Sequence, residues 1–180
     1  MRKKAIIVSI VILLLVTGFV LFGNRSYSIE EEEEKIFQIS LDNIRAVEDI
    51  ETATHYGNPV INNNKIENIN LTVKNPGDYI TFDFDIKNTG NQDGNISKIS
   101  IINNNCESED EDADAICNNI SVDLTYKNSN KEVKENDIIF ANSTNPINAT
   151  IIYNNGPNVK EDIEATIDNL NIEFEIIENS

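Results

Sequence analysis

The clearest structural signal in this chain is the run Tyr79-Ile80-Thr81-Phe82-Asp83-Phe84-Asp85-Ile86. Its even positions are apolar and polar residues stand between them, and this period of two is typical of a β-strand. A strand with one apolar and one polar face packs on a core with one side and faces water with the other, as strands of antiparallel sheets do. The run therefore predicts an antiparallel sheet with one buried face.

Turn signals lie on both sides of this run. Before it stands Asn75-Pro76-Gly77-Asp78, in which the proline fixes φ and the glycine tolerates a positive φ. After it stands Asn88-Thr89-Gly90-Asn91, which contains similar turn-forming residues. Because turn formation explains these residues without any ligand, we expect their role to be structural.

The same alternation recurs along the chain after residue 36. In its last example, Leu170, Ile172, Phe174 and Ile176 alternate with polar residues. The predicted strands are 36–41 with 44–47, 66–73, 79–86, 96–102, 120–126, 147–153 and 170–177. About seven short strands separated by turn signals are typical of a β-sandwich, so the sequence predicts one all-β module without internal repeats.

A family resemblance rests on residues 73–90, which read VKNPGDYITFDFDIKNTG. This segment resembles the "PGD…Y.F…V.N.G" core of Ig-like modules in the surface proteins of Firmicutes, which are Gram-positive bacteria. The resemblance covers residues 36–180 and implies an immunoglobulin-like antiparallel β-sandwich at the cell surface. More distantly, the chain resembles the secreted camelysin and biofilm-fibre proteins, from which it departs by lacking an alanine-rich signal ending.

The N-terminal region predicts a membrane anchor. Ala5–Gly23 is a run of nineteen residues without a charge, directly behind the basic residues Arg2, Lys3 and Lys4. About 20 apolar residues span the hydrocarbon core of a bilayer as a helix, and basic residues favour the cytoplasmic side. We therefore expect a cytoplasmic segment at 1–4, a transmembrane signal-anchor helix at 5–23 in contact with the lipid bilayer, and an extracellular remainder.

Signal cleavage near Ser26 or Ser28 is the alternative, and it would make the domain a secreted one. A cleavable signal has a shorter apolar region and small residues at the cleavage site, which favours the retained anchor here. Residues 24–35 form an acidic linker that contains five consecutive glutamates, Glu30–Glu34. A block of like charges repels itself and extends, so we expect a solvated stalk.

Composition limits the possible partners. The chain carries a formal net charge of −17, although Arg2, Lys3 and Lys4 contribute three positive charges. So acidic a surface repels nucleic acid and anionic headgroups and attracts cations diffusely. About one residue in six is asparagine, which we interpret as the codon bias of an AT-rich genome.

No motif for catalysis stands out. The sequence has no phosphate-binding loop and no nucleophile motif, and its single histidine, His55, is expected in an exposed loop. The sequence therefore predicts a protein that is not an enzyme and needs no cofactor, apart from the calcium alternative below.

Cys106 and Cys117 flank an acidic insert at residues 107–116. Cysteines of an exported domain can pair in an oxidising compartment, and a disulfide over a loop of this length adds about 2–3 kcal/mol of stability. Two free thiols or two metal-bound thiols are the alternatives.

The insert also suggests a calcium site. Asp110, Asp112 and Asp114 match the first three ligand positions of an EF-hand loop. However, Ala115 replaces the glycine that the sharp turn needs, and Ser121 stands where the bidentate glutamate belongs. The three aspartates therefore remain weak metal-ligand candidates.

A short inserted helix explains the same residues better. Ser108 would be its N-cap and Glu111 the N3 residue of a capping box. Ala113, Ile116 and Ile120 recur at helical spacing and could cover an open end of the sandwich.

Three functional hypotheses follow from the sequence. The first is a membrane-anchored extracellular Ig-like module for surface display or for interaction with an unidentified protein or cell-wall partner. The second is a secreted, pilus-type or fibre-type assembly subunit that self-associates by β-strand addition at exposed edges. The third is a calcium-dependent surface binding module.

Overall fold

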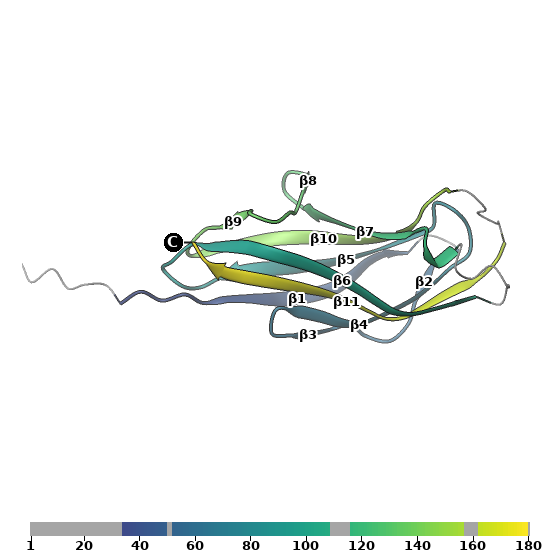
Figure 1. Ribbon diagram of the computed structural model, residues 1–180, viewed down its shortest axis with the longest axis horizontal. Coiled ribbons are helices and arrows are strands. Elements are labelled where there is room, and N and C mark those ends of the chain that lie inside the picture. The colour runs from purple at the N-terminus through teal and green to yellow at the C-terminus, as the bar shows by residue number, and fades with distance from the viewer. Residues whose placement is uncertain (1–33, 50–51, 109–115, 157–161, 180) are drawn as a thin grey trace, which may run out of the picture. The chain divides into compact units, whose positions relative to one another are not determined.

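The computed structural model describes residues 34–49, 52–108, 116–156 and 162–179, and within them the protein is all-β (Figure 1). Lys35–Ser180 forms one compact unit. Two antiparallel sheets pack face to face as a sandwich. The predicted β-sandwich class is confirmed.

The two sheets contain five and six strands. The first sheet has the order β1-β5-β10-β7-β8 and the second β2-β4-β11-β6-β9, with β3 paired to β4. The first sheet consists of β1 (Ile39–Asp49), β5 (Tyr79–Asn88), β10 (Ser143–Tyr153), β7 (Ile120–Tyr126) and β8 (Lys131–Glu132). The second consists of β2 (Thr54–His55), β3 (Val60–Asn62), β4 (Lys65–Val73), β11 (Ala165–Glu178), β6 (Gly94–Ser108) and β9 (Ile138–Ile139).

β5 and β11 carry the centre of the core. Within each sheet they have a strand on both sides, β1 and β10 for β5 and β4 and β6 for β11. The apolar residues of the predicted alternation in β5 are at most 1% exposed. Phe84 on β5 meets Phe174 on β11 with ring centroids 5.7 Å apart, so the two sheets contact each other through these strands.

The predicted turn before β5 is present, and it carries the chain from one sheet to the other. The Asp78 amide donates to the Asn75 carbonyl at 2.9 Å and Gly77 has a φ of +97°. Proline at the second position and a positive φ at the third are the features of a type II turn. The buried Asp78 carboxylate also accepts hydrogen bonds from the backbone amides of Lys74 and Asn75.

The segment after β5 is built around Asn88 and Gly90. The Asn88 amide group donates to the Gln92 and Ile139 carbonyls, and its oxygen accepts from the Gly90 amide at 3.0 Å. A Cβ on Gly90 would lie 2.2 Å from the Ile36 carbonyl oxygen, so only glycine fits here. The residues before β1 therefore pack directly against this turn.

Four short strands, β2, β3, β8 and β9, were not predicted. His55, expected in an exposed loop, lies in β2, which pairs with β4. Its half-buried ring packs edge-on against Phe82, with centroids 5.9 Å apart. Strands of two or three residues are too short to show a period in the sequence, and their pairing depends on the neighbouring long strand.

Several predictions fall on residues outside the described part. They are the anchor at 5–23, the cleavage positions, most of the linker at 24–35, and the greater part of the inserted helix. Among the described residues of that helix, Ile116 and Cys117 are helical, and Ile116 is buried in the core. No helix within the described ranges is long and apolar enough to cross a membrane.

Replacing Gly90 with alanine should destabilise the fold, because the new Cβ meets the backbone of Ile36 and neither can move freely. We expect the free energy of unfolding to fall by about 1–3 kcal/mol, as for other overpacked sites. Urea unfolding measures this loss. Thr89→Ala, at the exposed neighbouring position, is the control and should change stability by less than about 0.5 kcal/mol. Equal stability of the two variants would contradict the assignment of this contact.

Candidate functional site

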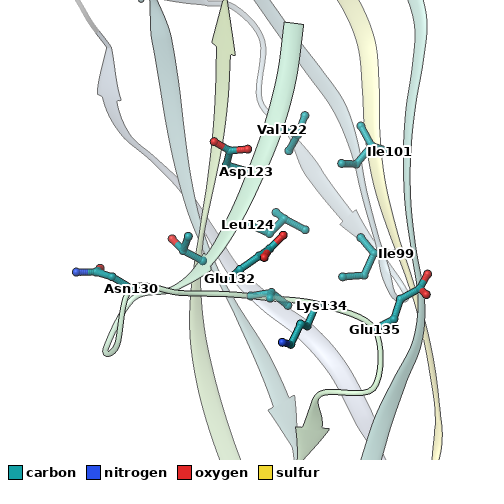
Figure 2. A pocket seen from close by; sticks show the side chains of 11 residues that line it. Ile99, Ile101, Val122, Asp123, Leu124, Asn130, Glu132, Lys134 and Glu135 are labelled. Carbon is teal, nitrogen blue, oxygen red and sulfur yellow. The ribbon is translucent and has the colours of Figure 1, made fainter. Parts of the chain in front are cut away.

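The candidate site is a groove along one open edge of the sandwich, between β6 of one sheet and β7 of the other (Figure 2). Its volume is about 530 Å³. The lining residues are Ile99, Ile101, Val122, Asp123, Leu124, Thr125, Asn130, Glu132, Val133, Lys134 and Glu135.

The walls of the groove are core-facing side chains. On β6, Ile99 and Ile101 lie opposite Phe174 and Ile172 of β11, whose side chains are buried. On β7, Val122 and Leu124 lie opposite Ile151 and Ala149 of β10, which are buried too. Cross-strand partners lie on the same face of a sheet, so both walls belong to the inner faces of the sandwich.

These walls are not fully covered. Ile101 is 45% exposed although it points toward the inside of the sandwich, whereas Leu124 is 5% exposed. Figure 2 shows Ile99 and Ile101 on one side of the opening and Val122 and Leu124 on the other. The groove is therefore a place where the apolar interior reaches the surface.

The backbones on both sides of the groove have free edges. β6 pairs with β9 through Gly94 and Asn95, and β7 pairs with β8 through Thr125 and Tyr126. Beyond these short pairings, no strand in the described part of the chain pairs with the outer edge of β6 from Lys98 to Glu107 or of β7 before Leu124. Unpaired edges present backbone donors and acceptors to a further strand.

One end of the groove is closed by the connection between β8 and β9, residues 133–137. Val133 is buried and its amide donates to the Leu124 carbonyl at 2.9 Å. The Asp137 carboxylate accepts from the Tyr126 hydroxyl at 3.0 Å and from the Lys134 amide at 3.1 Å. Burial, followed by the contact with Asp137, raises the pKa of Tyr126 well above its ordinary value.

Further along β6, beyond the residues that line the groove, lies the disulfide between Cys106 and Cys117, whose Cα atoms are 5.9 Å apart. Cys106 lies near the end of β6, and Cys117 lies three residues before β7 begins. The bond therefore ties β6 to the segment that leads into β7, although the two strands belong to different sheets. Of the alternatives left by the sequence, the structure has the paired cysteines.

The rim of the groove is acidic. Asp123, Glu132 and Glu135 are exposed there, and Lys134 is the cation among the lining residues. Asp123 lies between Val122 and Leu124 and points to the outer face, as the alternation along a strand requires.

The metal-ligand candidates Asp110, Asp112 and Asp114 lie outside the described residues. Within the described ranges, no group of three or more His, Cys, Asp and Glu side chains could hold a metal ion. Ser108, the expected N-cap, is the last residue of β6, and its hydroxyl donates to the Glu164 carbonyl at 3.0 Å.

A second depression, on the outer face of the first sheet, is lined by residues of β5 and β10 together with Lys127. The Lys127 ammonium forms an ion pair with the buried carboxylate of Asp83. Asp83 Oδ1 and Asn148 Oδ1 lack hydrogen-bond partners, and these residues are cross-strand neighbours. When the side-chain amide of Asn148 is oriented with its NH2 group toward Asp83, the nitrogen donates a hydrogen bond to the carboxylate. The cluster therefore connects β5, β10 and the end of β7.

Sequence reasoning did not find the groove. The β6 strand continues beyond the predicted end at Ile102 to Ser108, through three consecutive asparagines. The available signal was the stretch Ile99–Cys106, which has no charged residue or proline. Natural edge strands usually carry such residues to prevent pairing with other chains.

Comparison of the chain with protein-family models, with curated proteins and with solved structures gave no match. The resemblance to Ig-like surface modules therefore remains a prediction, and the groove is the feature of the described residues that bears on function.

Removing the disulfide should lower stability. For the double variant Cys106→Ser/Cys117→Ser we expect a loss of about 2–3 kcal/mol in the free energy of unfolding, from the larger entropy of the unfolded chain. Urea unfolding with and without a thiol reductant measures this. The reductant should destabilise the native chain to the same extent and leave the double variant unchanged; a native chain insensitive to reductant would argue against the bond.

Stability should fall at alkaline pH through Tyr126. The folded state raises its pKa, so the stabilisation is complete below the unfolded pKa of about 10 and is lost as pH rises above it. Tyr126→Phe should flatten this decline and cost about 1–2 kcal/mol at neutral pH, because Asp137 loses a donor. Urea unfolding at neutral and alkaline pH measures both effects, and an unchanged alkaline slope in the variant would contradict this role of Tyr126.

Proposed function

We propose that this chain is a membrane-anchored extracellular module with an immunoglobulin-like β-sandwich that binds an extended polypeptide segment in its edge groove, without catalysis. The apolar run at 5–23 and the basic residues before it support the anchor, and the acidic linker at 24–35 would hold the domain away from the bilayer. The partner is a protein or a polypeptide of the cell wall.

The observation that carries the proposal is the coincidence of two features in one place. Core-facing Ile99, Ile101 and Val122 are incompletely covered, and the strand edges beside them have no partner among the described residues. An added strand would cover the apolar side chains and satisfy the backbone groups together, which is the usual mode of strand addition.

The alternative of an assembly subunit uses the same groove with a second copy of the chain as the occupant. It predicts oligomers whose formation depends on Ile101. The calcium-dependent alternative rests on Asp110, Asp112 and Asp114, and identical melting curves with calcium and with a chelator would remove it.

A matched pair of variants tests the proposal. Ile101→Lys places a charge in the groove, whereas Ile177→Lys makes the same change at a residue of similar exposure, 49% against 45%, on β11 away from the groove. Peptides selected from a random library on the full chain in neutral detergent provide the ligands. We expect binding by fluorescence anisotropy to weaken at least about tenfold, or about 1.4 kcal/mol, in Ile101→Lys and to persist in Ile177→Lys.

Two outcomes would contradict the proposal. One is that the Ile101→Lys variant binds the selected peptides as tightly as the native chain does. The other is that both variants lose binding equally while their urea unfolding remains native, because the peptides would then bind elsewhere.

A further inference from the structure

We infer that the occupant of the groove is a basic extended segment of another protein, in which apolar residues alternate with lysine or arginine. The inference rests on the proposed function and specifies the chemistry of the partner. It follows from three properties of the groove: the direction of its edges, the face from which its apolar side chains come, and the charge of its rim.

The edges require an extended backbone. Backbone hydrogen bonds to β6 or β7 are available to a strand that runs beside them, and a helix has no free backbone groups to offer along its length. The edge of β7 before Leu124 is available to such a strand beside Asp123, and across the groove the β6 stretch Ile99–Cys106 has no charged side chain or proline.

The geometry also sets a period of two in the partner. Successive side chains of a strand point to opposite faces. Those that point inward would meet Ile99, Ile101 and Val122, so they should be apolar. On a strand that pairs with the free edge of β7, those that point outward would lie beside the outer-face residue Asp123, within the range of cross-strand pairing.

The rim decides the charge of the outward side chains. Asp123, Glu132 and Glu135 outnumber the cation Lys134, and the whole chain carries −17. Lysine or arginine on the partner would therefore be attracted, and glutamate or aspartate repelled. A second copy of this chain brings the same acidic charge to the contact, so the rim favours a different protein.

Three synthetic peptides test this chemistry on the full chain in neutral detergent. All have valine at alternate positions, and the residues between are lysine, glutamine or glutamate. We expect the lysine peptide to bind most tightly and the glutamate peptide not to bind, by fluorescence anisotropy. Binding of the lysine peptide should weaken several-fold as the salt concentration rises from about 0.1 M to 1 M, since salt screens exposed charges.

A charge reversal on the rim provides the matched control. Asp123→Lys should weaken binding of the lysine peptide several-fold and strengthen that of the glutamate peptide. Glu175→Lys makes the same change of charge at an exposed position of β11 outside the groove, and it should preserve the native order of the three peptides.

The outcomes separate this inference from the proposed function. Equal binding of the lysine and glutamine peptides, lost in Ile101→Lys, would overturn the basic specificity and retain the groove. Binding unaffected by Ile101→Lys would overturn both. Oligomers of the chain alone that dissociate in Ile101→Lys, seen by light scattering, would identify a second copy as the occupant and overturn the inference.

Discussion

The packing of β5 against β11 is the contact on which the rest of this structure depends. Each strand is hydrogen-bonded on both sides within its own sheet. The Phe84–Phe174 contact therefore connects the two sheets through strands that are each held by two neighbouring strands. Their apolar side chains belong to the buried core between the two sheets. Away from this centre the outer strands have fewer partners, and the covering of the interior depends on the connections between them.

One edge of the sandwich around that centre is incompletely covered. Beside β6 and β7, the connection through Val133 covers a part of the interior and leaves Ile101 exposed beyond it. A sandwich with an incompletely covered edge exposes apolar side chains and backbone groups together, which usually invites association. The acidic rim would then act as the selective element, because it repels segments of its own charge.

Much of the fold was predictable because the long strands carry strong period-two patterns. Each predicted strand corresponds to one of the seven longer strands in the described part of the chain, and the run at 79–86 lies entirely within β5. The groove was not predictable, since Ile99 and Ile101 show the same alternation as fully covered residues. Exposure at the edge of a sandwich depends on which strands of the two sheets become neighbours, and the alternation within one strand does not contain that information.

The backbone role of asparagine was also not predictable from composition. Its abundance was interpreted as codon bias, yet seven of the eight described residues other than glycine with a positive φ are asparagines. Asn169, with a φ of +55°, stands where the pairing of β11 with β4 shifts register. Asparagine tolerates this conformation better than most residues, so part of the asparagine content has a backbone role that composition alone could not reveal.

The disulfide and the Tyr126–Asp137 hydrogen bond lie beyond opposite ends of the groove, and each ties the β6 side of the sandwich to the β7 side before any partner arrives. A preorganised receptor loses little conformational entropy when a ligand enters, so more of the contact energy remains as affinity. It also needs no slow rearrangement, and association can then be limited by diffusion and orientation. Reduction of the disulfide would remove one of these two links, so the residence time of any bound segment would depend on the redox state of the surroundings.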